Sequence, residues 1–342
     1  MVPMTSPPPD EADWLRVEEP SAPAGVRRRV TALAERLGFD AERLGQVQLA
    51  ATEAATNLVK HAERGEMLVR IVRDGDRAEV EIVCLDRGPG IADVPLSLLD
   101  GFSTAGSLGV GLGAIGRLAD RSGLYSHPGG GTVLFARFRQ PGSPAGDPPF
   151  AGLTRPIDGE RECGDAYAVR VFGRAVHALL CDGLGHGPLA ARASAEAVRA
   201  VRELTAPIRP RDLLDLVHRR LTATRGGAVA VATVDLDDRT VRFAGIGNVA
   251  GWIVAPGGRQ GLVSTPGIAG ERSRTVREYE YELPAGASVV LHSDGLTDRW
   301  DLSDRPGVLG RDPLLLAGVL IRDAGTRHDD RAVLVVGPGD RP

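Results

Sequence analysis

Cysteine and lysine are scarce in this chain of 342 residues. The three cysteines, Cys84, Cys163 and Cys181, stand alone, with no CxxC pair and no regular spacing to histidine. Isolated cysteines of odd number exclude a disulfide framework and a zinc site, and they are typical of a reduced, cytoplasmic chain. Lys60 is the only lysine, and the resulting bias toward arginine says little about chemistry.

Long apolar runs and an excess of positive charge are also missing. No stretch approaches the length of a membrane span, and the N-terminus has neither the basic start nor the apolar core of a signal peptide. The net charge of −4 differs from the basic balance that is usual in nucleic-acid-binding proteins. We therefore expect a cytoplasmic protein that binds neither membranes nor nucleic acids.

Proline and glycine, in contrast, are abundant and mark the boundaries of the expected parts. A length of 342 residues suggests two domains. Residues 1–13 are proline-rich and acidic, which predicts a disordered tail. Residues 139–150 are rich in proline and glycine, and we interpret them as a linker. The expected domains are residues 14–138 and 151–338.

Helical and strand patterns occur in both expected domains, which indicates an α+β protein. In the first, residues 25–37 and 41–62 have helical patterns, and two alternating runs around the turn DGD predict a hairpin. A short helix is expected near residues 112–121. In the second domain, a hairpin that turns at FGR is followed by a helix and five further strands. That order predicts antiparallel sheets with helices on their outer faces.

Aspartates stand at the ends of several predicted strands of the second domain. Asp165 begins one strand of the hairpin and Asp182 ends its antiparallel neighbour, so both lie at one edge of the sheet. Asp294 follows a later strand, and Asp329 and Asp330 precede the last one. Like charges held together need a cation, and oxygen ligands favour magnesium, manganese or calcium over zinc. The alternative is a set of ordinary solvated turns, in which aspartate is common.

The segments GDAY, CDGLGHG, HSDGLTD and HDDRAVLVV, in this order, resemble the motifs of the PPM (type-2C) phosphatases, specifically their bacterial SpoIIE/RsbX-like branch. The resemblance covers residues 151–338 and implies an α-β-β-α sandwich that hydrolyses phosphoserine or phosphothreonine with two Mn²⁺ or Mg²⁺ ions. It implies that Asp182 bridges the ions and that Asp294, like Asp182, is a catalytic metal ligand. The remaining implied ligands are Asp165, Asp329 and the carbonyl of Gly183.

Two positions depart from that family's pattern. Leu184 stands where eukaryotic relatives carry a histidine directly after the metal-binding Asp-Gly, so that acid is missing. His186 lies nearby and is a candidate general acid, although a loop histidine is more often only a hydrogen-bonding residue. Ala332 stands where relatives often carry threonine. The implied ligands are all present, so these departures bear on the rate only.

Polar residues line one face of a predicted helix in the first domain. Glu53, Asn57 and Lys60 fall at i, i+4 and i+7. The glycine-rich residues 103–120 open a later helix, where backbone amides favour phosphate oxygens. Their spacing matches neither a Walker loop nor a dinucleotide fingerprint. Taken alone, the first helix fits an ordinary amphipathic helix with a solvated polar face.

Together with LDRGPGI, these features resemble the Bergerat-fold (GHKL) ATPases, an α/β sandwich, and most closely the RsbT/RsbW-type serine kinases. The resemblance covers residues 14–138. It implies that Asn57 holds the Mg²⁺ bridging the ATP phosphates, that Asp86 accepts the adenine amino group, and that Glu53 is the catalytic base. The other implied nucleotide-binding residues are Thr132 behind the adenine, Gly88 and Gly90 at the base, and Gly109, Gly111 and Gly113 over the phosphates.

The two resemblances together predict a bifunctional regulator of a partner-switching pathway. The first domain would phosphorylate a serine or threonine of a STAS-domain antagonist or stressosome-type protein, and the second would remove such phosphates. Two alternatives stay open. One is a phosphatase whose first domain only binds ATP or an anti-sigma partner as a sensor, and the other is a non-catalytic sequestering module.

Overall fold

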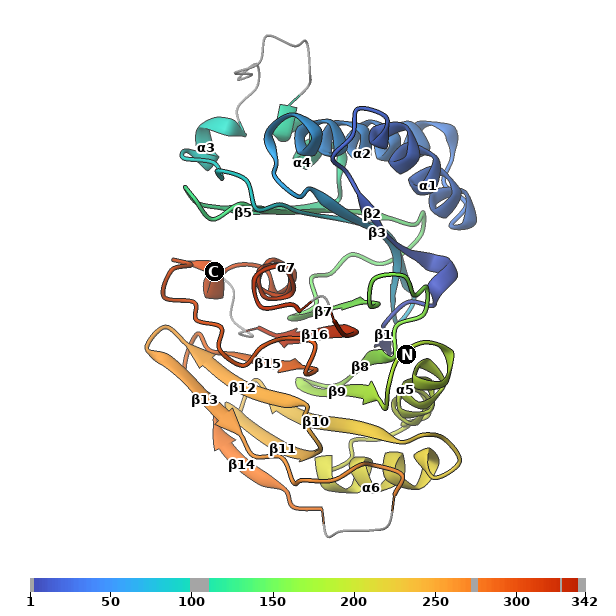
Figure 1. Ribbon diagram of the computed structural model, residues 1–342, viewed down its shortest axis with the longest axis vertical. Coiled ribbons are helices and arrows are strands. Elements are labelled where there is room, and N and C mark those ends of the chain that lie inside the picture. Colours follow the sequence, from blue (N-terminus) through green and yellow to red (C-terminus); the bar gives the residue numbers. More distant parts are fainter. Residues whose placement is uncertain (1–2, 99–110, 272–275, 327, 338–342) are drawn as a thin grey trace. The chain divides into compact units, whose positions relative to one another are not determined.

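The protein divides into two compact units (Figure 1). This computed structural model describes residues 3–98, 111–271, 276–326 and 328–337. The first unit comprises Pro7–Gly146, and the second runs from Asp147 onward and includes the described residues before Pro7. No helix among the described residues is long and apolar enough to cross a bilayer.

The first unit is a five-stranded antiparallel sheet with helices on one face (Figure 1). Its elements are η1 (Pro9–Glu11), β2 (Ala12–Arg16), α1 (Ala22–Arg36), α2 (Ala41–His61), β3 (Glu66–Asp74), β4 (Arg77–Leu85), α3 (Val94–Ser97), α4 (Gly111–Leu118), β5 (Arg121–Ser126) and β6 (Thr132–Arg139). The strand order is β2-β3-β4-β6-β5. Helices α1 and α2 pack together and on the sheet, and α4 packs on α2, so one apolar core lies between the two layers.

Local chemistry explains why these elements begin and end where they do. The Asp40 carboxylate accepts a 2.8 Å hydrogen bond from the Arg43 amide and caps α2. The β3–β4 hairpin turns at Gly75, whose φ of 63° suits glycine. The two expected helices and this hairpin are confirmed. The expected helix near 112–121 is shorter, because Arg121 already begins β5, an edge strand that the sequence pattern did not show.

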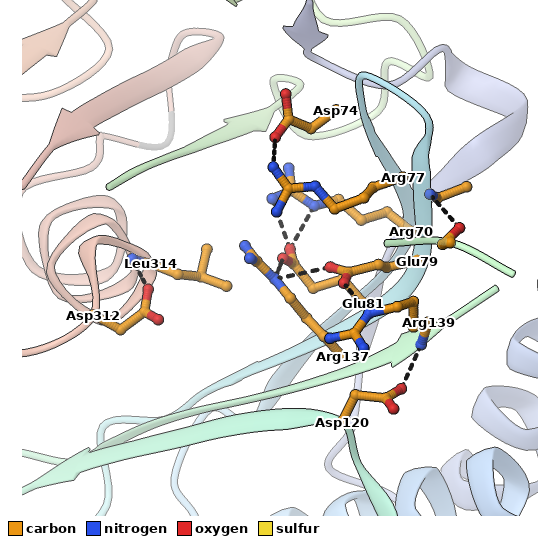
Figure 2. Close-up of polar contacts among 12 residues, drawn as sticks. Arg70, Asp74, Arg77, Glu79, Glu81, Asp120, Arg137, Arg139, Asp312 and Leu314 are labelled. Atoms are coloured by element: carbon orange, nitrogen blue, oxygen red, sulfur yellow. Dashed lines mark hydrogen bonds and ion pairs between the residues drawn. The ribbon is translucent and has the colours of Figure 1, made fainter. Parts of the chain in front are cut away.

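A charge network lies on the face of this sheet opposite the helices (Figure 2). The Glu81 carboxylate accepts hydrogen bonds from Arg70 Nε at 2.7 Å and from Arg137 Nε at 2.6 Å. Arg137 also lies 3.9 Å from Glu79, which faces Arg139 at 3.7 Å. Because these side chains come from three adjacent strands, the network joins β3, β4 and β6 across the sheet.

The second unit is a sandwich of two antiparallel sheets. Its elements are β1 (Met4–Thr5), β7 (Phe150–Arg155), β8 (Asp165–Phe172), β9 (Ala175–Gly183), α5 (Pro188–Arg202), α6 (Pro210–Leu221), β10 (Gly227–Asp235), β11 (Thr240–Ile246), β12 (Ala250–Ala255), β13 (Gly258–Leu262), β14 (Tyr279–Glu282), β15 (Ser288–His292), η2 (Val308–Gly310), α7 (Pro313–Asp323) and β16 (Arg331–Val336). The sheet orders are β1-β8-β9-β10-β11-β14 and β13-β12-β15-β16-β7.

The sheets face each other and the helices cover the outer faces (Figure 1). Helices α5 and α6 pack on β8 to β11, and α7 packs on β7 and β16. Between the sheets, Gly152 of β7 lies so close to the Tyr167 ring of β8 that a Cβ there would stand 2.7 Å from it. The layers are therefore α-β-β-α, as expected from the sequence, and the first unit supplies the expected α/β sandwich. The sequence patterns identified the central strands of both sheets but missed β7, β13, β14, α6 and α7.

The chain before Pro7 differs from the expected disordered tail over residues 1–13. Met4 and Thr5 pair with Val169 and Ala168 of β8, and the Ser6 amide donates to the Tyr167 carbonyl at 3.0 Å. Burial of the Met4 side chain, which is 2% exposed, favours this pairing. A tail that composition indicated as disordered is therefore an edge strand of the second unit's sheet.

We expect Glu81→Gln to destabilise the first unit by about 2 kcal/mol or more, because an uncharged amide replaces the buried carboxylate that two guanidinium groups share. The measurement is hydrogen–deuterium exchange of peptides covering β3 and β4. Asp10→Asn, which removes the exposed pair with Arg36, is the matched control and should cost less than about 1 kcal/mol. Equal protection in the two variants would contradict the structural role of Glu81.

Candidate functional sites

The strand register of the second unit gathers carboxylates at one end of the sandwich. Asp165 and Asp182 stand directly opposite each other at the open end of the β8–β9 hairpin. Asp294 follows β15 by two residues, and Asp329 and Asp330 precede β16, the antiparallel neighbour of β15. Strand β16 packs against β8 and β9. Carboxylates from both sheets therefore meet at the same end, as the sequence predicted for the hairpin pair.

Burial and mutual repulsion make these carboxylates hold protons unusually tightly. The pKa of Asp182 is raised to about 8, first by burial and then by the charge of Asp294, with which it shares a hydrogen bond. Burial and the charge of Asp182 raise the pKa of Asp165, against a hydrogen bond from Ser293. Burial and Asp329 raise the pKa of Asp294. This end of the sandwich thus carries more negative charge than the protein itself neutralises.

One oxygen of the cluster has no partner and is suited to a metal ion. Asp165 is 4% exposed, and its Oδ2 accepts no hydrogen bond from the part of the chain that the structure describes. An orphaned buried carboxylate oxygen is costly unless a cation or water satisfies it. Among the described side chains, however, no three Asp, Glu, His or Cys residues stand close enough to enclose an ion. The oxygen donors fit Mg²⁺ or Mn²⁺ in kind, and the ligand set stays a prediction.

Asp330 and Gly183 are held by the backbone around the cluster. The two oxygens of Asp330 accept the amides of Ile157 at 2.7 Å and Gly164 at 2.8 Å, so Asp330 ties two loops together and leaves Asp329 as the more available acid. A Cβ on Gly183 would stand 2.3 Å from the Ala190 carbonyl oxygen, so only glycine fits there.

Three residues around Asp294 were missed by sequence reasoning. Asn248 Nδ2 donates to Asp294 Oδ2. The Ser293 hydroxyl accepts the Ala332 amide at 2.9 Å, which joins the end of β15 to the start of β16.

His292 Nε2 accepts hydrogen bonds from the indoles of Trp252 at 3.3 Å and Trp300 at 3.2 Å. His292 Nδ1 therefore carries the proton, which it donates to the Ser293 carbonyl. His292 and Ser293 belong to the segment HSDGLTD, but their contacts, like those of the distant Asn248, Trp252 and Trp300, are visible only in the fold.

His186, the candidate general acid, lies in the exposed loop between β9 and α5. Its Nδ1 is 3.3 Å from Glu160 Oε1. This carboxylate orients the imidazole, and the charge of His186 also acts on Asp330. The structure therefore places a hydrogen-bonded histidine beside the carboxylate cluster, while Leu184 is exposed.

In the first unit, the residues predicted to bind adenine lie where β4 ends beside β6. The Asp86 amide donates to the Thr132 carbonyl at 3.0 Å, and Asp86 Oδ1 accepts the Gly88 amide at 2.8 Å. The Ser126 hydroxyl lies 3.0 Å from the Thr132 hydroxyl. A Cβ on Gly90, whose φ is 72°, would stand 2.0 Å from the His127 carbonyl oxygen. The structure thus brings Asp86, Gly88, Gly90 and Thr132 together.

The predicted phosphate side is described only in part. Asn57 and Glu53 lie one helical turn apart on α2, and Asn57 Nδ2 is buried without a hydrogen-bond partner among the described residues. Gly111 begins α4 with a φ of 70°, and a Cβ on Gly113 would stand 2.3 Å from the Leu98 carbonyl oxygen. Gly109 lies outside the described residues. An unsatisfied amide on the helix that packs on α4 fits a bound polar group.

Comparison with known proteins assigns each unit to a family. A family model described as a histidine kinase-like ATPase domain matches residues 17–138, and that of stage II sporulation protein E (SpoIIE) matches residues 173–337. The first unit therefore carries a histidine kinase-like ATPase domain, and the second carries a SpoIIE domain. The family composition expected from the sequence motifs is confirmed.

The similar proteins include two from Bacillus subtilis (strain 168). Serine/threonine-protein kinase RsbT is 36% identical over 104 residues, which are 30% of this chain and 78% of RsbT. Phosphoserine phosphatase RsbX is 24% identical over 145 residues, 41% of this chain and 70% of RsbX. A chain solved in work on the bacterial stressosome is 29% identical, with a TM-score of 0.49, and the match covers 54% of this chain and 97% of that one.

The raised pKa of Asp182 predicts how stability depends on pH without metal. The folded state holds this proton more tightly than the unfolded state, whose carboxyl has the ordinary value of 3.8, so the free energy of unfolding should fall as pH rises from about 4 to about 8. Urea denaturation in a chelator at several pH values measures this. Asp182→Asn should flatten the fall, and saturating Mn²⁺ should stabilise the wild type more at pH 8 than at pH 5.5. Stability that rises with pH across this window would contradict the assignment.

Asn57→Ala should lower the affinity for Mg·ATP at least about tenfold, because the amide no longer holds the ion that tethers the phosphates. Isothermal titration calorimetry measures this, with Gln48→Ala on the same helix as the control. Wild-type affinity in the Asn57 variant would remove Asn57 from the nucleotide site.

Proposed function

We propose that the protein is a bifunctional partner-switching regulator. Its first unit would transfer phosphate from Mg·ATP to a serine or threonine of a STAS-domain antagonist or stressosome-type protein. Its second unit would hydrolyse phosphoserine or phosphothreonine with two Mn²⁺ or Mg²⁺ ions. The observation that carries the proposal is the gathering of Asp165, Asp182, Asp294 and Asp329 at one end of a sandwich whose family is that of a phosphatase.

In the hydrolysis, Asp182, Asp294, Asp329 and the Gly183 carbonyl would hold the metal ions, with Asp165 close to the second. When bound, the ions supply a hydroxide at neutral pH and stabilise charge on the phosphoryl oxygens. Asn248 holds Asp294 and Ser293 holds Asp165 in place through hydrogen bonds. The seryl oxygen leaves as the P–O bond breaks, and it takes up a proton for which His186 is the candidate donor.

In the transfer, Asn57 would hold Mg²⁺ and Asp86 would fix the adenine. Glu53, on the same helix, would accept the proton of the attacking hydroxyl. The kinase name of RsbT, which matches this unit at 36% identity, and the phosphatase name of RsbX support opposite activities in the two units.

The test is incubation of the full-length protein with γ-labelled ATP and candidate STAS proteins, followed by removal of ATP and addition of Mn²⁺. We expect serine or threonine labelling that Asn57→Ala abolishes, and Mn²⁺-dependent release of the label that Asp182→Asn removes. The loss of a bridging ligand should cost the reaction several kcal/mol, hence at least about a hundredfold in rate.

Other results assign other functions. ATP binding without transfer, together with intact hydrolysis, would support a sensor role for the first unit. Unchanged hydrolysis in Asp182→Asn would refute the two-metal assignment. The absence of both reactions with every candidate would leave a sequestering module as the explanation.

A further inference from the structure

Arg225 stands near the loop that follows Asp182, in a turn whose backbone is closely held. The turn joins α6 to β10. The Thr224 hydroxyl accepts the Gly226 amide at 3.0 Å and donates to the Leu221 carbonyl at 2.7 Å. Gly226 has a φ of 77°, and a Cβ on it would stand 2.5 Å from the Ala269 carbonyl oxygen. The position of Arg225 is therefore set by its neighbours on both sides.

The strand register brings this arginine to the end of the sheet that carries Asp182. In the β9–β10 pair, Ala228 is opposite Asp182 and Gly227 is opposite Gly183. The next carbonyl, that of Gly226, accepts the Leu184 amide at 3.0 Å. Arg225 directly precedes Gly226, the residue whose carbonyl contacts the loop that follows Asp182.

The Arg225 guanidinium lies close to Gly185, in the loop that follows Asp182. Arg225 Nη1 lies 3.4 Å from the place that a Cβ on Gly185 would occupy. Gly185 has a φ of 87°, which side chains rarely allow. The absence of a side chain at Gly185 therefore leaves space beside the guanidinium.

Arg225 is also a cation without a described partner. It is exposed, and the structure describes no hydrogen bond or ion pair to its side chain, whereas the nearby Arg220 pairs with Glu203. Two of the clustered acids have other partners, since Asp330 binds two amides and Asp294 binds Asn248. An arginine fork that no carboxylate occupies is suited to bind a phosphoryl group through two parallel hydrogen bonds.

We propose that Arg225 binds the phosphoryl oxygens of the phosphoserine substrate and orients the ester toward the carboxylate cluster. The inference rests on the proposed phosphatase activity. It assigns a substrate-binding residue just before β10. No sequence motif indicates this residue, since Arg225 lies in the segment TRGG.

The experiment uses the full-length protein with Mn²⁺ and two substrates, p-nitrophenyl phosphate and a phosphoserine peptide. Arg225→Ala should raise KM for both about tenfold or more with a smaller change in kcat, because the lost contact is a charge-assisted hydrogen bond. The inhibition constant of inorganic phosphate should rise by a similar factor. Arg225→Lys, which keeps the charge, should recover part of the loss. Arg219→Ala, an exposed arginine on α6, is the matched control and should leave all constants unchanged.

Equal KM and inhibition constants in the Arg225 and Arg219 variants would overturn the proposal and leave the phosphatase activity standing. A KM that rises for the peptide alone would also overturn it, because the guanidinium would then contact the peptide and not the phosphate.

Calorimetric binding of inorganic phosphate in Mn²⁺ separates the two claims. Phosphate binding that Arg225→Ala weakens, in a wild type that hydrolyses neither ester, would refute the phosphatase function and retain the phosphate site. A wild type that neither hydrolyses an ester nor binds phosphate would refute both. Unchanged melting temperatures show that the variants fold.

Discussion

Repulsion between carboxylates at one end of the β sandwich is the interaction on which the second unit's chemistry depends. Asp165 and Asp182 face each other across a hairpin, and Asp294 and Asp329 join them from the other sheet. No arginine is paired with these four among the described residues, so the charge remains available for a cation. A surplus of this kind lowers stability without metal, and for this reason it indicates a site selected for binding and not for folding.

The surrounding polar contacts hold the acids at this end despite their repulsion. Both oxygens of Asp330 accept backbone amides. Ser293 joins the end of β15 to the start of β16, and His292 accepts hydrogen bonds from two indoles. These hydrogen bonds fix the backbone next to Asp294 and Asp329 and do not neutralise the carboxylates. Arg225 adds one positive charge near the loop that follows Asp182.

Both predicted sites contain a glycine at which another part of the backbone approaches closely, although their chemistry differs. Gly183 beside the carboxylates and Gly90 beside Asp86 each stand within 2.3 Å, at the Cβ position, of a carbonyl oxygen. A side chain at either place would displace the neighbouring strand or loop. Glycine in these motifs therefore shapes the sites, and the glycine content of the chain, read as composition alone, does not reveal which positions matter.

Much of this could be read from the sequence, because the signals are local. Alternation identified the central strands, and an antiparallel hairpin must place its first and last residues opposite each other, which predicted the meeting of Asp165 and Asp182. The motifs, taken in order, identified both families. Helix α7 and the edge strands were missed, since short or uniformly buried segments carry little periodicity. Helix α6 was missed although it is amphipathic.

The sequence by itself determined the family of each unit, the strands that carry the acids and the residue types able to bind metal and nucleotide. Only the tertiary structure decided that Met4 and Thr5 complete a sheet more than 160 residues away, that Asp330 is a backbone clamp, and that Arg225 leans over the loop after Asp182. The reason is physical. Alternation and turn chemistry act over a few residues, whereas pairing between distant segments and the partner of each charge are set by packing, whose free energy belongs to the whole domain.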